Sequence, residues 1–491
     1  MNRNTKSGVW KTIRRALCHV PVWMWVSVLC VCAFFVNSSQ MPSDIMEARN
    51  LVTAREMAHD GHWMIPTMNG ELRLEKPPLP TWVAGVVEKV LPDNIAAQRA
   101  VPGLMACLWT WCLFLLARYM SQRKEVALAA VLVFITCYQV VFMGRQATWD
   151  IWCHALMTAA VYCLLRGLCD KEHPHPWRWL PSAGILMGLS FMSKGPVAFY
   201  ATLLPWLLAV LMVIKPQWKG KWRPLMVMFL LCVIVSSWWY VYVMLVHPDT
   251  MQEVTAKETA AWGERRARPF WYYWRFVFET GIWTPAAVIV LAIPYWHKRI
   301  NDKKTYLFGM AWLLLTILML SLVPEKKPRY LLPAMAPFAL ATGTWLVHLK
   351  AKRVLWGIAI LFMVVECLLL PTVYKFYDLP YGPSISSVRE DSRLATVDFF
   401  RPKDEQTRIE IVYKAGRKIL PLNLQDSAST CAVLPCAVFT SHSPDSVILP
   451  VTLQWTDTVR VGRFDDNTHK KGSRHYHENY IMHVILLTPK Q

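Results

Sequence analysis

Charged side chains are scarce in this sequence. Only 18% of its 491 residues are Asp, Glu, Lys or Arg, and 54% are hydrophobic. Soluble domains usually carry about a quarter charged residues, so the composition excludes an ordinary soluble protein and favours a polytopic membrane protein. Apolar runs such as 126–143 and 225–245 approach or reach the roughly 20 residues that cross a hydrocarbon core, which supports the same conclusion.

Two further signatures are absent from the sequence. It has no Cys-x-x-Cys pair or Cys/His box, and its closely spaced histidines at 469, 475, 477 and 483 lack metal-ligand spacing, so they predict a solvated surface. It has no internal repeat, and apart from Glu366 the charges of the apolar region lie at the ends of the runs. A transporter needs charges within its spans and paired repeats, so that function is disfavoured.

The basic residues are distributed in a way that indicates membrane orientation. Net charge is +20, but many Lys and Arg residues lie in short loops between apolar runs, which favours the positive-inside rule over a nucleic-acid groove. The basic N-terminus followed by the apolar stretch 20–36 predicts a retained signal-anchor. We predict about eleven spans. They begin near residues 21, 98, 125, 151, 180, 197, 224, 282, 305, 331 and 354.

Alternation of the spans sorts the loops into two sets. With the N-terminus in the cytoplasm, the short basic loops on that side are 118–124, 166–178, 215–223, 297–304 and 350–353. The opposite set contains the first loop, about 40 to 95, the turns 144–150, 193–196 and 324–330, and the loop 247–270. Every unusual polar cluster therefore opens on the outer face.

A change in composition predicts two domains. Residues 1–374 form the transmembrane domain, and residues 375–491 are polar, with β-like segments such as 409–413 and 480–487. An odd number of spans places this tail outside the membrane on the same face as the polar clusters. The predicted fold is mainly α, with a small α/β or β-rich extracytoplasmic domain at the C-terminus.

The first outer loop carries charges of both signs. Residues 44–59 contain no Pro or Gly and predict a helix, on which Asp44 and Glu47 share a face. The simpler interpretation is an N-terminal cap with a capping box. Further along, Pro77 and Pro78 fix the backbone next to Glu75 and Lys76. A rigid Lys suits a phosphate, although an exposed Glu–Lys pair before a turn is common.

Other charges lie at the outer ends of spans. Asp150 is either a helix cap or a site acid, and Lys194, before a Gly-Pro turn, either marks the membrane interface or faces an anion. The basic turn 326–330 lies where the positive-inside rule disfavours it, which indicates an anionic ligand. Acids and cations beside lipid fit an isoprenoid phosphate that carries a sugar. Its tail would lie in the membrane and its phosphate on Lys and Arg.

The ordered motifs resemble a family. The chain is similar to bacterial membrane glycosyltransferases of the GT-C type, the protein mannosyltransferase-like and lipid A aminoarabinose transferase group. The matching pieces, in family order over about residues 20–370, are Glu47-Ala48-Arg49, Ala54-Arg55-Glu56-Met57, Gly61-His62-Trp63 to Pro66, Asn69-Gly70 to Glu75-Lys76-Pro77-Pro78-Leu79, Gly144-Arg145 to Asp150, Lys194-Gly195-Pro196, Pro269-Phe270-Trp271-Tyr272-Tyr273, and Pro328-Arg329-Tyr330-Leu331-Leu332-Pro333.

The resemblance implies an enzyme, its donor and its location. It implies transfer, with inversion, from a polyprenyl-phosphate sugar at the periplasmic face of the bacterial inner membrane. It also implies that Arg49, Lys76 and Tyr330 hold the donor phosphate and that Glu75 sits at a possible divalent-metal position. The predicted site residues are Asp44, Glu47 and Asp150 as catalytic acids; Arg49, Lys76, Lys194, Arg329 and Tyr330 on the donor phosphate; and Glu75 and Glu264 as metal ligands.

Two departures from the family affect the acceptor and the metal. The family usually has Asp-Glu where this chain has Met46-Glu47, so Asp44 is the candidate substitute for the missing acid. Where aminoarabinose relatives carry a histidine, the loop here offers Glu258 and Glu264.

The displaced acid bears on the choice of acceptor. A Ser or Thr hydroxyl needs a carboxylate base, whereas a lipid A phosphate is already ionised near neutral pH. The displacement of the acid to Asp44 therefore favours lipid A or a related glycolipid as acceptor, with protein O-glycosylation from the same donor as the alternative.

Overall fold

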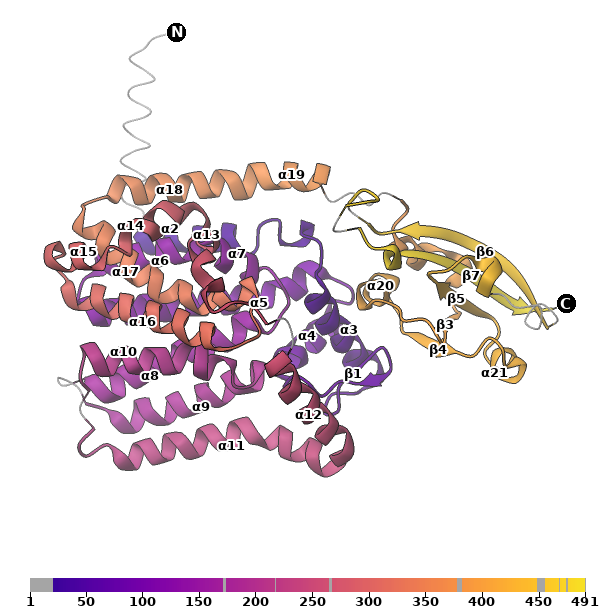
Figure 1. Ribbon diagram of the computed structural model, residues 1–491, viewed down its shortest axis with the longest axis horizontal. Helices are drawn as coiled ribbons and strands as arrows, with labels where there is room; N and C mark the ends of the chain where they lie inside the picture. The colour runs from indigo at the N-terminus through magenta and orange to yellow at the C-terminus, as the bar shows by residue number, and fades with distance from the viewer. Residues whose placement is uncertain are drawn as a thin grey trace, which may run out of the picture. The chain divides into compact units, whose positions relative to one another are not determined.

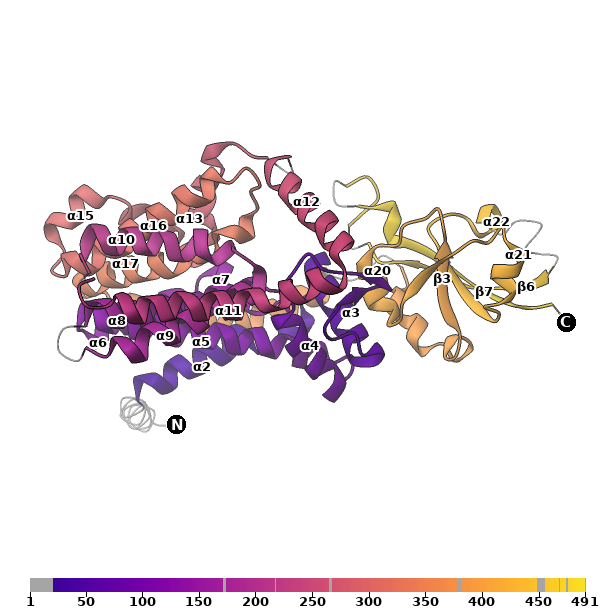
Figure 2. The same ribbon diagram turned by 90° about the horizontal axis from the view of Figure 1, so that it is seen from below.

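The chain forms two compact units (Figures 1 and 2). The computed structural model describes residues 21–490 except 171–173, 217, 265–266, 378–381, 448–454, 468 and 474–475. The helical unit comprises residues 1–38, 99–145 and 149–370. The mixed unit comprises residues 39–98, 146–148 and 371–491, so the chain passes between the units several times.

The helical unit is built from helices, several of them long and apolar. They are α2 (Val22–Phe34), α5 (Ile95–Ser121), α6 (Lys124–Ile135), α7 (Tyr138–Gly144), α8 (Asp150–Cys169), α9 (Pro176–Lys194), α10 (Leu204–Val213), α11 (Trp222–Val246), α12 (Pro248–Glu264), α13 (Phe276–Glu279), α14 (Thr284–Val290), α15 (Ile293–Arg299), α16 (Lys303–Leu322), α17 (Met335–His348) and α18 (Lys352–Val364). Short 3₁₀ and π turns join several of them: η1 (Ser38–Gln40), η2 (Phe199–Leu203), η3 (Phe270–Arg275), η4 (Gly281–Trp283), η5 (Pro328–Ala334) and η6 (Val365–Leu369).

Fewer helices qualify as spans than the eleven we predicted. Among the described residues, seven helices are long and apolar enough to cross a membrane, and the bent pair α6–α7 makes an eighth. The segments expected near 197 and 282 form shorter apolar helices, 199–213 and 281–290. α9 forms near 180 but is not among the seven. The chain is thus a mainly helical, multi-pass membrane protein with seven or eight candidate spans.

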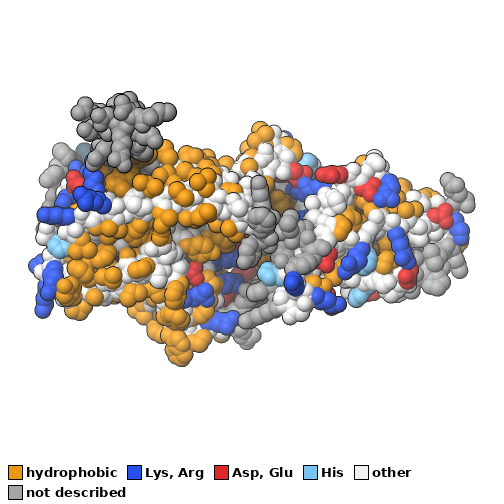
Figure 3. All heavy atoms as spheres, turned by 90° about the horizontal axis from the view of Figure 1, so that it is seen from above, with side chains coloured by type: hydrophobic (Ala, Val, Ile, Leu, Met, Phe, Trp, Pro, Cys, Tyr) orange, Lys and Arg blue, Asp and Glu red, His pale blue; other side chains and the backbone are white. Residues whose placement is uncertain are grey.

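The surface of the helical unit agrees with membrane embedding. Hydrophobic side chains cover much of the left half of Figure 3, where the helical unit is seen, and Lys and Arg side chains lie along its left-hand edge. α18 presents exposed Ile360 and Leu361, and η6, which leads into α19 (Leu370–Tyr377), presents exposed Leu368 and Leu369. The C-terminal ends of α8, α10 and α17, each followed by a basic loop in the sequence, lie at the same end of the unit (Figure 1). Which end faces the cytoplasm stays a prediction.

The mixed unit contains a five-stranded sheet. Its order is β4 (Ile419–Leu422), β3 (Asp398–Pro402), β5 (Cys436–Thr440), β7 (Ile481–Pro489) and β6 (Thr456–Asp465). The first three strands are parallel, and β7 pairs antiparallel with both β5 and β6. The remaining elements near the sheet are η7 (Ile385–Glu390), η8 (Ser392–Leu394), α20 (Ile409–Ala415), α21 (Ser427–Cys431), α22 (Pro444–Val447) and η9 (Glu478–Tyr480). The predicted small α/β domain is therefore present.

One strand prediction in this unit is wrong. Residues 409–413 form helix α20, not a strand, whereas 480–487 fall on β7 as expected, apart from the first residue. Ile411, Val412 and Ala415 are buried at the 3–4 residue spacing of a helix face, and Gly416 ends the helix with φ +83°. Five alternating residues are too few to separate the two periods.

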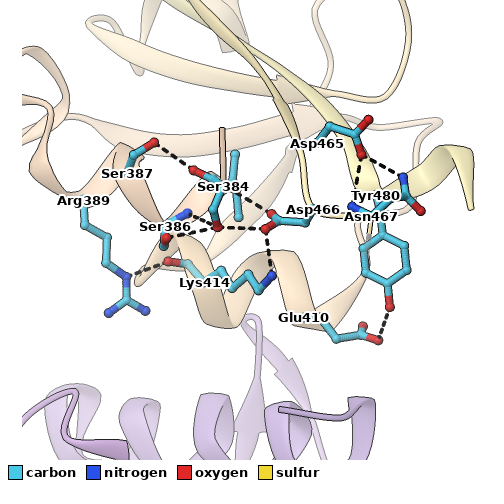
Figure 4. Close-up of polar contacts among 11 residues, drawn as sticks. Ser384, Ser386, Ser387, Arg389, Glu410, Lys414, Asp465, Asp466, Asn467 and Tyr480 are labelled. Atoms are coloured by element: carbon cyan, nitrogen blue, oxygen red, sulfur yellow. Dashed lines mark hydrogen bonds and ion pairs between the residues drawn. The ribbon is translucent and has the colours of Figure 1, made fainter. Parts of the chain in front are cut away.

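The sheet is tied to the segment 383–385 by a buried carboxylate. Asp466 accepts hydrogen bonds from Ser384 Oγ at 2.7 Å and Ile385 N at 3.1 Å, and it pairs with Lys414 Nζ at 2.7 Å (Figure 4). Tyr480 Oη donates to Glu410 Oε1 at 3.1 Å nearby. These contacts fix the entry of the chain into the domain.

The first loop packs with this sheet domain. It forms α3 (Ile45–Asp60), the hairpin β1 (Thr67–Met68) and β2 (Glu71–Leu72), and α4 (Leu79–Val90). Asn69 exchanges two hydrogen bonds with the backbone of Ile419, and Val52 of α3 lies in the same apolar cluster as the inner face of the sheet. The division into 1–374 and 375–491 stays a prediction about domains, while the contacts group the first loop with the C-terminal residues.

Candidate active site

A buried ion pair forms the centre of the polar cluster in the helical unit. Asp150, at the first turn of α8, is 2% exposed, and its Oδ1 pairs with Lys194 Nζ at the end of α9. Gly195, with φ +72°, stops α9 directly after this lysine. A buried charge is costly unless it is paired, so each partner stabilises the ionised form of the other.

Tyr330 completes this cluster. Its ring centroid lies 5.4 Å from Lys194 Nζ and 5.5 Å from Lys327 Nζ, distances at which a cation is attracted to an aromatic face. Lys327 Nζ also pairs with Glu325 Oε1 at 2.5 Å. Arg329 is one of the charges that act on the Asp150 carboxylate. The structure thus brings together four predicted residues, Asp150, Lys194, Arg329 and Tyr330.

His154 belongs to the same region and was not predicted. It lies one helical turn after Asp150 on α8, is 2% exposed, and shares a 2.9 Å hydrogen bond with Thr202 Oγ1. Thr202 sits in the π turn η2, a type of turn that often marks functional sites. The i to i+4 spacing from Asp150 was the signal that could have identified this histidine.

The predicted acids of α3 contact the backbone. Asp44 caps the helix, because its Oδ1 accepts hydrogen bonds from Met46 N at 2.9 Å and Glu47 N at 2.8 Å. This confirms the capping interpretation of Asp44. Glu47 is fully buried and its Oε1 accepts a 2.8 Å hydrogen bond from Ala147 N. Catalysis by either acid stays a prediction.

Arg73, which was not predicted, connects α3 to the motif that follows it. It is 7% exposed, and its Nη1 donates to Arg49 O at 2.7 Å and Thr53 Oγ1 at 2.8 Å. Burial lowers the pKa of Arg73 to about 10; Glu75 raises it and Arg49 lowers it further. The group therefore keeps its charge near neutral pH and adds a cation beside the predicted phosphate ligand Arg49.

That the proline pair holds Glu75 and Lys76 in place stays a prediction. They lie between β2 and α4, whose N-cap is Pro78, and both prolines are buried. Glu75 is exposed and Lys76 is half-buried. Both belong to the mixed unit, together with Arg49, Asp44 and Glu47.

The metal prediction has limited support in the geometry. Among the residues that the structure describes, no group of three or more His, Cys, Asp or Glu side chains is arranged to hold a metal ion. Glu264 ends α12, and its side chain lies outside the described part of the chain. The ligand roles of Glu75 and Glu264 stay predictions, and we derive no reaction step through a metal.

Arg55 links two parts of the mixed unit. Its Nη2 lies 2.6 Å from Asp93 Oδ1, and its guanidinium lies 5.4 Å from the Tyr413 ring centroid. Arg389 pairs with the same Asp93 oxygen at 3.0 Å. Arg55, one of the charged residues of the first loop, therefore links α3 to the C-terminal domain.

Comparison with known proteins extends these observations. A model of the dolichyl-phosphate-mannose-protein mannosyltransferase family matches residues 75–240. The chain is 25% identical over 369 residues to an uncharacterized protein of Aquifex aeolicus (strain VF5), covering 70% of this chain and 71% of that protein. It is 26% identical over 326 residues to undecaprenyl phosphate-alpha-4-amino-4-deoxy-L-arabinose arabinosyl transferase 1 of Pseudomonas fluorescens (strain Pf0-1), covering 62% of this chain and 54% of that one.

A solved structure shares the fold over nearly the whole chain. The structure of ArnT from Cupriavidus metallidurans bound to undecaprenyl phosphate superposes with a TM-score of 0.70 at 15% identity, covering 95% of this chain and 97% of that one. The chain spans about half the length of the curated arabinosyl transferase of P. fluorescens, at 54%. The chain is thus similar to the dolichyl-phosphate-mannose-protein mannosyltransferases over residues 75–240 and to an arabinosyl transferase over 62% of its length, and it shares the fold of ArnT.

Proposed function

We propose that this chain transfers a sugar from a polyprenyl-phosphate donor to lipid A or a related glycolipid, with inversion at the anomeric carbon. The reaction takes place at the outer face of the bacterial inner membrane. The observation that carries the proposal is the buried Asp150–Lys194 pair with the Tyr330 ring against its lysine, all in motifs of the family. The sugar donor named for the P. fluorescens arabinosyl transferase and the undecaprenyl phosphate bound in the ArnT structure support the same class of donor.

In the proposed reaction an acceptor oxygen attacks the anomeric carbon opposite the donor phosphate. A new bond forms between that carbon and the acceptor oxygen, the bond to the donor phosphate oxygen breaks, and polyprenyl phosphate leaves with the electron pair. Lys194 and Arg329 supply positive charge as the leaving phosphate becomes more negative. Cations already held in place need no rearrangement at that moment, so they lower the barrier.

The state of the α3 acids favours an acceptor that is already ionised. Asp44 caps its helix and Glu47 accepts a bond from Ala147 N, so each has an oxygen committed to the backbone. A Ser or Thr hydroxyl needs a free carboxylate base, whereas a phosphate of lipid A does not. Protein O-glycosylation with the same donor is the second candidate, supported by the name of the matching family.

A transfer assay in membranes tests the proposal. With a radiolabelled polyprenyl-phosphate sugar, Lys76→Ala and Asp150→Ala should each abolish transfer while protein abundance stays constant. Lys89→Ala is the matched control, because Lys89 is an exposed lysine of α4 in the same loop. Full activity in both site variants would refute the assignment. Mass spectrometry of lipid A and of outer glycoproteins from a deletion strain then separates the two acceptors.

A further inference from the structure

Glu366 is an acid within one of the most apolar segments of the chain. The span candidate Lys352–Val373 has a mean hydropathy of 2.4, and only 22% of its most apolar window is buried. Glu366 is nevertheless 7% exposed and lies in the π turn η6, which interrupts the α-helix. Ionisable residues inside a membrane span are costly and usually functional. The sequence motifs of the family do not account for this residue.

The partner of Glu366 is Arg145, which connects three parts of the helical unit. Arg145 Nη1 lies 2.6 Å from Glu366 Oε2. Its Nε donates to Ala33 O at 2.6 Å and its Nη2 to Cys32 O at 2.7 Å, both at the end of α2. Asn37 Nδ2 also donates to Glu366 O at 3.1 Å. One guanidinium therefore fixes α2, the end of α7 and the last span candidate.

Stability alone does not explain this pair. Apolar residues of similar volume often replace a buried ion pair without loss of stability, so the pair is weak evidence for a purely structural role. Its position suggests another role. Arg145 caps the C-terminus of α7, and Asp150, the first residue of α8, follows five residues later. The connection between Arg145 and Asp150 has only four residues, so the position of Arg145 restricts the position of Asp150.

We infer that Glu366 is a positioning residue for the proposed transferase. Through Arg145 it holds the start of the 146–149 connection, and so it fixes the place of Asp150 beside Lys194. The inference rests on the proposed function, in which the Asp150–Lys194 pair belongs to the active site. Misplacement of a reacting group by about 1 Å can cost two orders of magnitude in rate, so a remote ion pair can have a large effect on turnover.

Three variants separate positioning from folding. Glu366→Met and Arg145→Met each leave a buried charge without its partner, whereas the double variant replaces the pair by two apolar side chains. We expect the double variant to regain much of the thermal stability lost by the single variants. Its kcat per mole of folded enzyme should remain at least about tenfold below wild type, with the KM for the donor within about twofold.

The measurements are kcat and KM for each variant, normalised to folded protein in detergent. Asp170→Asn is the matched control, because it breaks the 2.9 Å Arg166–Asp170 pair at the opposite end of α8 and should leave kcat unchanged. A double variant with wild-type kcat per folded enzyme would overturn the inference, whatever its stability.

A second readout does not depend on activity. Hydrogen–deuterium exchange at residues 146–153 should become faster in the double variant and stay unchanged in Asp170→Asn. If wild type transfers no sugar but exchange still responds, the proposed function fails and the role of the pair in holding the connection stands. If wild type is active and neither exchange nor kcat responds, the inference fails and the proposed function stands.

Discussion

The acids of α3 and the acids of the helical unit are satisfied in different ways. Asp44, Glu47 and Glu56 accept hydrogen bonds from backbone N–H groups of their own unit. Asp150 and Glu366 instead pair with the side chains of Lys194 and Arg145. Asp44, Glu47 and Asp150 were predicted together as catalytic acids, and the sequence did not separate the two modes of pairing.

The difference indicates two kinds of role. A carboxylate that binds backbone N–H groups shapes a loop, and its loss leaves several buried donors without an acceptor. A carboxylate that pairs with a cation beside other cations keeps a charged cluster in place, and that cluster can act on an anionic ligand. We therefore expect substitutions in α3 to affect stability first and substitutions around Asp150 to affect turnover first.

The largest expected effect is on stability. Glu56 is 3% exposed and accepts hydrogen bonds from Thr67 Oγ1 at 2.6 Å, Asn69 N at 2.5 Å and Gly70 N at 3.3 Å. Glu56→Ala leaves these donors in the hairpin unsatisfied and should lower the free energy of unfolding by about 3 kcal/mol. Denaturant or thermal unfolding in detergent measures the loss.

Glu71 provides the control for this experiment. It lies on β2 of the same hairpin and is exposed, so Glu71→Ala should change stability by less than about 0.5 kcal/mol. If Glu56→Ala keeps its stability but loses turnover per folded enzyme, the contrast between the two groups of acids is broken.

The next effect tests the role of Tyr330. The resemblance assigns its hydroxyl to the donor phosphate, whereas the structure places its ring against Lys194 and Lys327. Tyr330→Phe keeps the ring and loses one hydrogen bond to a charged group, so the KM for the donor should rise about tenfold with kcat within about twofold. Steady-state kinetics with varied donor measures both constants.

Tyr119→Phe is the matched control, because Arg166 lies 5.3 Å from the Tyr119 ring centroid near the other end of the span. It should leave both constants unchanged. An unaltered KM in Tyr330→Phe, together with a lower kcat in Tyr330→Leu, would assign the function of this residue to its ring alone.

The sequence predicted the elements better than their pairings. Apolar runs and breakers located the helices that begin near 151, 224, 305 and 354, because length and hydropathy are local properties. The Gly-Pro turn after Lys194 also placed this lysine at the end of a helix, and the proline pair after Lys76 marked the start of α4, as the structure has them. Local chemistry was enough for these features.

Contacts between distant residues could not be predicted in this way. Glu366 meets Arg145 across more than 200 positions, and Asn69 meets Ile419 across 350. Arg73 acquires its surroundings only from packing, so no local pattern marked it, whereas the spacing of His154 from Asp150 on α8 was a local signal that the prediction missed. The segment 409–413 was misassigned for a related reason, since a buried face on a short helix and on a short strand look alike in sequence.

The smallest expected effect tests whether pairing with cations alone marks an active acid. Burial opposes ionisation of Asp93, but Arg55 and Arg389 outweigh burial and lower its pKa. Its contribution to stability is therefore present above the unfolded pKa of about 3.9 and is lost as pH falls through the folded pKa.

Asp93→Asn should cost less than about 1 kcal/mol at pH 7, because the side chain is 46% exposed, and nothing once wild-type Asp93 is protonated. Unfolding of both proteins from pH 7 down to pH 2 measures this, with the exposed Asp445→Asn as control. Turnover per folded enzyme should not change in Asp93→Asn. If turnover falls, pairing with cations marks an active acid in the mixed unit as well as in the helical unit, and Asp93 belongs to the same group of acids as Asp150.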